Sequence, residues 1–136
     1  METFKILMIM ASLLFNAGQP AAQSPDAILG DWYTVDNKSI VRFDLNLNSN
    51  SDAYNGKVIW ISDKVDRENA RKMNGMTTAK NLVFDPVRKI YKGLIYIPKL
   101  DEYRKTEFEL KNSQLEFTVK VGFITKHIVW TRKEDK

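Results

Sequence analysis

Residues 40–47, IVRFDLNL, alternate apolar and polar side chains: Val41 and Phe43 fall on one face of an extended chain, and Arg42 and Asp44 fall on the other. A period of two with one apolar side predicts a β-strand that buries one face and exposes the other to water. This stretch therefore predicts a β-sheet protein in which one face of the sheet packs against the core.

The same alternation recurs along the chain after residue 28, between short turns rich in Asn, Asp, Ser and Pro. It predicts about eight strands at hairpin spacing. They fall near residues 31–35, 40–47, 55–61, 80–84, 89–97, 104–110, 114–122 and 126–132. One connection is longer. Residues 62–80 carry charged and small side chains and are expected to form a short helix or an ordered loop across one end of the sheet structure.

Two tryptophan signatures stand at the ends of this run, Gly30-Asp31-Trp32 in the first strand and Trp130-Thr131-Arg132 in the last. A guanidinium over an indole face forms a cation–π contact that adds about 0.5–2 kcal/mol. First and last strands that meet in this way close the sheet on itself. We therefore expect an all-β, single eight-stranded antiparallel up-and-down barrel, whose closure leaves no exposed edge. The residues expected to close it are Gly30, Trp32, Trp130 and Arg132, with ligand contact as the alternative role for Trp32 and Arg132.

A barrel of eight strands has an interior that side chains can fill, or that can hold one small ligand. The candidate lining, and hence the candidate ligand-binding residues, are aromatic: Phe43, Trp60, Tyr96, Phe108 and Phe117. Ligand cavities are mostly apolar and aromatic. The same rings could equally form a solid core, and the alternation of the strands leaves both possibilities open.

Residues 1–22 differ from the rest of the chain. Lys5 precedes an apolar run at residues 6–15, and small residues follow. The run is shorter than the roughly 20 apolar residues that span a bilayer, and the pattern is typical of a cleaved secretory signal peptide. A buried N-terminal helix is the alternative. Cleavage would leave residues 23–136 as one barrel domain of about 110 residues in the periplasm or outside the cell.

Charge and composition exclude several classes of protein. The net charge is +4, but basic residues are spread along the chain near acidic ones, so no nucleic-acid partner is expected. The polar strand faces carry charges of both signs, which a lipid-facing barrel would not tolerate, so no membrane span is expected in the mature protein. The absence of cysteine excludes a disulfide framework and a lipidated N-terminal cysteine.

The residues offer no catalytic or metal-binding constellation. His127 is the only histidine, and without a second histidine or a cysteine it makes a poor metal site. Asp63, Asp66 and Glu68 lack the turn glycine of a calcium loop. No serine stands in a nucleophile motif. We therefore expect no enzyme activity, no metal and no cofactor.

Four motifs in order resemble a family of small exported bacterial proteins, catalogued as domain of unknown function 2147. The motifs are Gly30-x-Trp32, Gly56-Lys57-Val58-Ile59-Trp60, Gly93-Leu94-Ile95-Tyr96-x-Pro98 followed by Tyr103, and Trp130-Thr131-Arg132. The resemblance runs from about Ile28 to Arg132. It implies a lipocalin-like (calycin-like) barrel, an exported location and a small-molecule cavity, and it implies no enzyme activity.

Together these features favour an exported, non-enzymatic binding protein that holds a largely apolar ligand, such as a lipid or fatty acid, inside a β-barrel. The alternative is a protein-interaction or structural module with a solid core, which acts through its outer surface or through residues 62–80. The sequence leaves the oligomeric state open.

Overall fold

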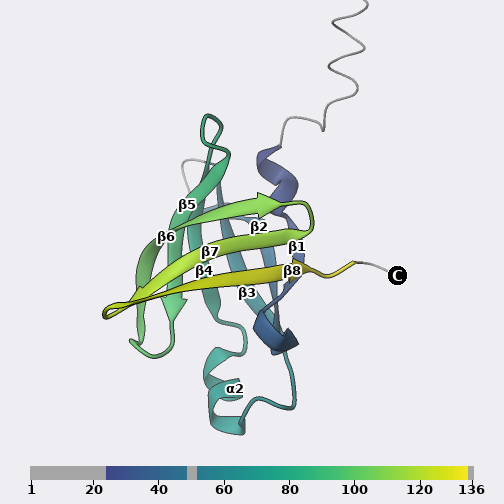
Figure 1. The fold of residues 1–136 in the computed structure, drawn as a ribbon. Helices are drawn as coiled ribbons and strands as arrows, with labels where there is room; N and C mark the ends of the chain where they lie inside the picture. The colour runs from purple at the N-terminus through teal and green to yellow at the C-terminus, as the bar shows by residue number, and fades with distance from the viewer. Residues whose placement is uncertain (1–23, 49–51, 135–136) are drawn as a thin grey trace, which may run out of the picture.

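The computed structural model of the chain describes residues 24–48 and 52–134 (Figure 1). The expected signal peptide, residues 1–22, lies outside them. The strands are β1 (Gly30–Tyr33), β2 (Ser39–Leu45), β3 (Ala53–Ile61), β4 (Thr77–Asp85), β5 (Ile90–Ile97), β6 (Glu102–Lys111), β7 (Gln114–Val121) and β8 (Ile124–Arg132). Two 3-10 turns, η1 (Pro25–Ile28) and η2 (Val35–Asn37), and one short helix, α2 (Arg67–Met73), complete the fold.

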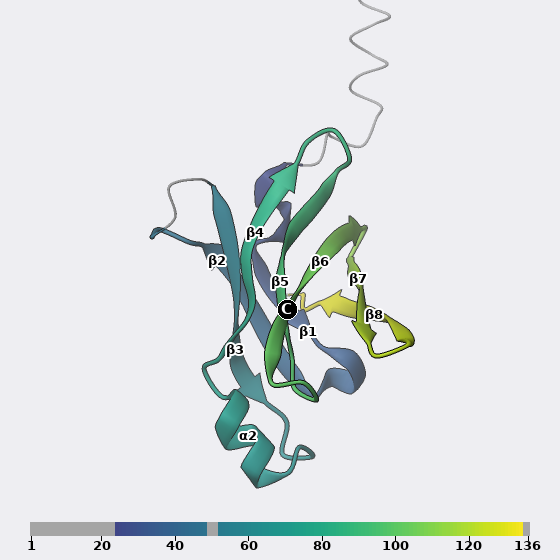
Figure 2. The ribbon, with the colours of Figure 1, turned by 90° about the vertical axis from the view of Figure 1, so that its left-hand side faces the viewer.

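The strands form one closed antiparallel barrel in sequence order, β1 to β8. Closure is made by β1 and β8, where Trp32 lies opposite Arg132 and Tyr33 opposite Thr131. The expected eight-stranded all-β barrel is confirmed. Figures 1 and 2 show α2 beyond one end of the barrel, with η1 and the turn between β4 and β5 at the other. We call these the α2 end and the η1 end.

The seam between β1 and β8 holds η1 in place. The Arg132 guanidinium lies 4.2 Å from the centroid of the Trp32 ring. It donates one hydrogen bond to the Leu29 carbonyl at 2.9 Å and another to the Ala27 carbonyl. The Trp32 indole N–H donates to the Ile28 carbonyl at 2.9 Å. Both side chains thus fasten the segment just before β1.

The other two residues expected to close the barrel, Gly30 and Trp130, differ in their surroundings. Gly30 has φ 113°, and a Cβ there would lie 3.3 Å from the Arg132 guanidinium, so this position favours glycine both by conformation and by space. Trp130 stands in β8 beside the seam, and its side chain lies inside the barrel. It is 6% exposed, and its ring centroid is 5.0 Å from that of Phe117.

The η1 end of the barrel is solid. Tyr91 donates a hydrogen bond to the Pro25 carbonyl at 2.6 Å, and Tyr54 donates one to the Asp26 carboxylate at 2.6 Å. Burial, together with the hydrogen bond to Asp26, raises the pKa of the Tyr54 hydroxyl. These bonds place η1 over fully buried rings. The largest fully buried side chains are Trp32, Tyr54, Tyr91, Phe43 and Phe108.

Bulges interrupt the alternation of the described strands at three places: one lies between Lys80 and Val83 of β4, and the other two bear on the cavity. In β3, Val58 lies opposite Val41 while Trp60 lies opposite Ile40, so Ile59 is an extra residue. In β4, the corresponding extra residue is Thr78. A bulge places two residues opposite one, and the side chains beyond it change faces.

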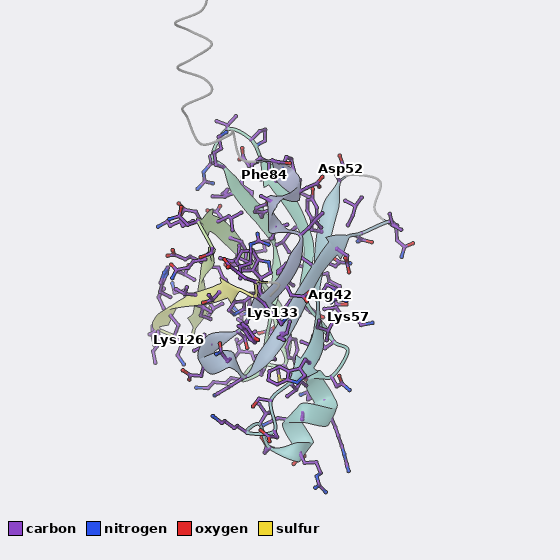
Figure 3. The ribbon with its side chains drawn as sticks, turned by 90° about the vertical axis from the view of Figure 1, so that its right-hand side faces the viewer. Arg42, Asp52, Lys57, Phe84, Lys126 and Lys133 are labelled. Carbon is purple, nitrogen blue, oxygen red and sulfur yellow. The ribbon has the colours of Figure 1, made fainter. Side chains whose placement is uncertain are left out.

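The outer face of β2 and β3 before the bulge is charged. Figure 3 shows Arg42 and Lys57 beside each other on the outside of these strands, in agreement with their register. Arg42 donates two hydrogen bonds to the Asp31 carboxylate, at 2.8 and 3.0 Å. This bond, more than any other effect, lowers the pKa of Asp31.

Gly56→Ala is expected to destabilise the fold by about 1–3 kcal/mol through overpacking. A Cβ at Gly56 would lie 2.8 Å from Val41 Cγ1 and 2.9 Å from two ring atoms of Phe43. Chemical denaturation would measure the loss. Ala53→Gly on the same strand removes a methyl group instead, and serves as the matched control. A Gly56→Ala protein as stable as wild type would show that the ring of Phe43 can move.

Candidate functional site

A cavity of about 520 Å³ opens at the α2 end of the barrel. Its inner wall is apolar and comes from the inward faces of the strands. Deepest in the barrel are Val41, Val58, Ile95, Phe117 and Trp130, and closer to the mouth are Ile61, Ile97, Val119 and Ile128. The barrel is therefore hollow in one half and filled in the other.

Polar side chains gather at the rim of this cavity. They come from the segment around η2, the loop that leads into α2, α2 itself and the first residues of β4. The polar lining residues are Thr34, Lys38, Ser39, Lys64, Asp66, Asn69, Lys72 and Thr78. An apolar wall below a polar rim suits a ligand with an apolar body and a polar end.

Hydrogen bonds hold the loop before α2 against the barrel. The Ser62 amide donates to the Lys38 carbonyl at 2.7 Å, and the Lys64 amide donates to the Ser62 hydroxyl at 3.2 Å. Asp66 caps α2: its carboxylate accepts a bond from the Asn69 amide at 3.3 Å and another from the Asn69 side chain at 2.6 Å. Residues 62–80 were expected to form a short helix or an ordered loop across one end of the barrel. In the structure they form a loop, then the short helix α2, and then the start of β4.

A second attachment joins α2 to the turn between β5 and β6. Lys72 Nζ lies 3.3 Å from the Asp101 carboxylate, and the Tyr96 hydroxyl donates a hydrogen bond to the same carboxylate. The bond from Tyr96, and then Lys72, lowers the pKa of Asp101. Hydrogen bonding to Tyr96 and then Asp101 raises the pKa of Lys72. These contacts fix α2 at the side of the mouth.

The hydroxyl groups on the lining differ in their bonding. Thr34 and Ser39 bond each other, with 2.8 Å between their hydroxyl oxygens. Thr78 is 7% exposed, and its hydroxyl forms no hydrogen bond to any residue within 24–48 or 52–134. Because buried hydroxyl groups are normally hydrogen-bonded, that of Thr78 is available to a bound molecule.

The five aromatic residues predicted to contact ligand fall in three different places. Phe117 and Tyr96 belong to the cavity lining, although the Tyr96 ring also packs on Tyr103, with 5.5 Å between the ring centroids. Phe43 and Phe108 are 0% exposed and belong to the core cluster rather than the lining.

Trp60 differs most from its expected place. It is 44% exposed and does not line the cavity. Continued alternation from Val58 would have turned it inward. The bulge at Ile59 adds one residue, so Trp60 shares the outer face with its partner Ile40.

None of the polar residues at the rim, Lys38, Lys64 and Thr78 among them, was a sequence-based ligand-binding candidate. Lys38 and Lys64 look like ordinary solvated lysines in a turn and a loop, and Thr78 enters the lining at a bulge. Only the expectation that residues 62–80 cross the mouth pointed toward Lys64 and Thr78.

His127, considered from the sequence as a metal ligand, lies outside the cavity lining. The His127 ring nitrogen lies 2.9 Å from the Glu116 carboxylate on the exposed face of β7 and β8. Among the residues that the structure describes, no three His, Cys, Asp or Glu side chains are grouped as metal ligands would be. No helix within those same ranges is long and apolar enough to cross a membrane.

Comparison with known proteins gives one match. The model of a family described as "Uncharacterized protein conserved in bacteria (DUF2147)" matches residues 30–132. The matched region begins at the glycine of β1 and ends at Arg132, so it contains every strand of the barrel. No curated protein and no solved structure matches the chain.

Proposed function

For this chain, which belongs to that uncharacterized bacterial family, we propose a binding function. It is an exported, non-enzymatic protein of the periplasm or the medium that holds a small, largely apolar molecule, such as a lipid or fatty acid, in its barrel. The cavity at the α2 end carries this proposal. Its volume of about 520 Å³ lies within the roughly 300–1,000 Å³ range of small-molecule sites.

The division of the barrel into two halves supports binding over the solid-core alternative. Buried rings fill the η1 end, and the hydrogen bonds of Tyr54 and Tyr91 hold η1 over them. The α2 end keeps an apolar wall around open space. Apolar surface exposed to water costs about 25 cal/mol per Å². A ligand that covers this wall removes apolar surface from water, and the free energy of binding becomes more favourable.

Native mass spectrometry tests the proposal directly. The protein would be purified without detergent and measured before and after incubation with a mixed lipid extract. We expect a discrete additional mass that is released on denaturation and whose fragmentation identifies the ligand class. A bare polypeptide mass under both conditions would overturn the proposal and favour the interaction module.

Val119→Trp is expected to weaken ligand binding at least tenfold, a change of about 1.4 kcal/mol, because the larger ring occupies the cavity. Val119 is 8% exposed and lines the cavity, so the indole has open space to enter. The melting temperature should therefore change little. Val83→Trp, at a position of β4 that is 43% exposed and outside the lining, is the matched control. Equal affinities of the two variants would contradict the location of the site.

A further inference from the structure

We infer that the ligand is a single-chain amphiphile with an anionic head group, and that Lys38 and Lys64 bind this head group at the mouth of the cavity. This inference rests on the proposed binding function and adds the chemical class and the orientation of the ligand. The chain of the ligand lies against the apolar wall, and its charged end faces the rim.

The distribution of polarity in the cavity supports this orientation. The residues that line the deepest part of the cavity are all apolar: Val41, Val58, Ile95, Phe117 and Trp130. All charged lining residues come from the position just after η2, the loop before α2 and α2. A molecule with a polar group at its inner end would have to bury that group against side chains that offer no partner, at a cost of about 1–3 kcal/mol. A molecule with its polar group at the rim avoids this cost.

The charge at the rim is positive. Lys38, Lys64 and Lys72 line the mouth, against one acidic lining residue, Asp66. The Asp66 carboxylate accepts hydrogen bonds from the backbone amide and the side-chain amide of Asn69 at the start of α2. Lys72 has its partner in Asp101. Within the described part of the chain, neither Lys38 nor Lys64 forms an ion pair, so their charges are the ones left for a ligand.

Lys38 and Lys64 are held near each other by one residue. The Ser62 amide bonds the Lys38 carbonyl, and the Ser62 hydroxyl accepts the Lys64 amide. The two lysines start from backbone positions joined through Ser62, and both line the same mouth. Two ammonium groups that converge on one carboxylate or phosphate form charge-assisted hydrogen bonds, which are stronger than neutral ones.

Thr78 provides an independent sign of a polar ligand group. Its side chain is more than nine-tenths buried, lines the cavity and has a hydroxyl without a hydrogen-bond partner among the described residues. It stands at the second position of β4, whose first residues lie at the α2 end. The hydroxyl can therefore donate to the head group that the lysines bind.

The size of the cavity limits the ligand to one chain. A water molecule occupies about 30 Å³ in the liquid, and a methylene group is of similar size. A cavity of about 520 Å³ thus has room for about seventeen such groups. A fatty acid or alkyl phosphate of about ten to fourteen carbons fits this space. A lipid with two long chains exceeds it.

The test compares ten-carbon ligands that differ only in the head group. Decanoate, decyl phosphate, decanol and decyltrimethylammonium would be titrated into the wild-type protein by calorimetry. We expect at least one anionic ligand to bind about tenfold or more tightly than decanol, the factor that one charge-assisted contact provides. That advantage should shrink as salt is added, because the lysines are exposed. The tighter of the two anions identifies the head group.

Variants of the two lysines complete the test. In Lys38→Met with Lys64→Met, decanol affinity should stay within about twofold of wild type, while the advantage of the anion falls to nearly nothing. Lys89→Met, in the turn between β4 and β5 at the η1 end, is the matched control and should leave all affinities unchanged.

The outcomes separate this inference from the proposed function. If none of the ligands binds, the proposed function itself fails. Equal affinities for anion and alcohol, or a preference for the cation, would overturn the inference and leave the binding function standing. Loss of the anion's advantage in the Lys89 variant would also overturn it.

Discussion

Replacing Arg132 by alanine is expected to lower the melting temperature of this protein by about 12–24 °C. The change removes the guanidinium that lies 4.2 Å from the Trp32 ring centroid. It also leaves the carbonyls of Leu29 and Ala27 without their donor. Together these losses amount to about 3 kcal/mol, and each kcal/mol shifts the midpoint of a small domain by about 4–8 °C.

Two further variants isolate the cause of this effect. Arg132→Lys keeps the charge but loses the planar fork that reaches two carbonyls at once, so we expect an intermediate melting temperature. Arg104→Ala breaks an exposed ion pair with Glu102 and should cost less than about 1 kcal/mol. An unchanged midpoint for Arg132→Ala would contradict a structural role for the seam between β1 and β8.

Phe43→Ala is expected to destabilise the protein by about 3–5 kcal/mol, the range for truncating a buried phenylalanine. Phe43 is 0% exposed, its ring centroid lies 6.3 Å from that of Trp130, and it takes no part in the cavity lining. Urea denaturation would measure the loss. Binding of decanoate by the folded fraction should change little, because Phe43 belongs to the filled half of the barrel.

Val119→Ala is the comparison in the hollow half. Its side chain faces the cavity, so fewer atoms pack against the methyl groups that are removed. We expect a loss of only about 1 kcal/mol in stability and a measurable loss of affinity. If Phe43→Ala weakened binding more than Val119→Ala did, the ligand would contact the half of the barrel that we describe as filled, and our assignment of the two halves would be wrong.

The local patterns of the sequence were enough to predict the barrel. Alternation in residues 40–47 and its repeats predicted strands that pair in chain order, and all eight appear with ends shifted by a few residues. The signatures around Trp32 and Arg132 predicted that the first and last strands meet. These features depend on periods of two and on short turns, which neighbouring residues determine without help from the rest of the chain.

The site followed from the sequence only in part. Phe117 and Tyr96 were predicted to contact ligand and do line the cavity, but Trp60 lies outside it. Alternation carries no information about a bulge, because the extra residue at Ile59 is defined only by its pairing with β2. Thr78 enters the lining for the same kind of reason, through pairing with β3.

Local patterns in the sequence were therefore sufficient to predict the strands, their order and the closure of the barrel. Packing across the barrel fills the η1 end with rings, leaves the α2 end open, and joins the backbones of Lys38 and Lys64 through Ser62 beside the mouth. A cavity is the difference between the space that the strands enclose and the volume of the side chains that point into it. That difference depends on register, bulges and packing across the whole barrel, which no local pattern contains.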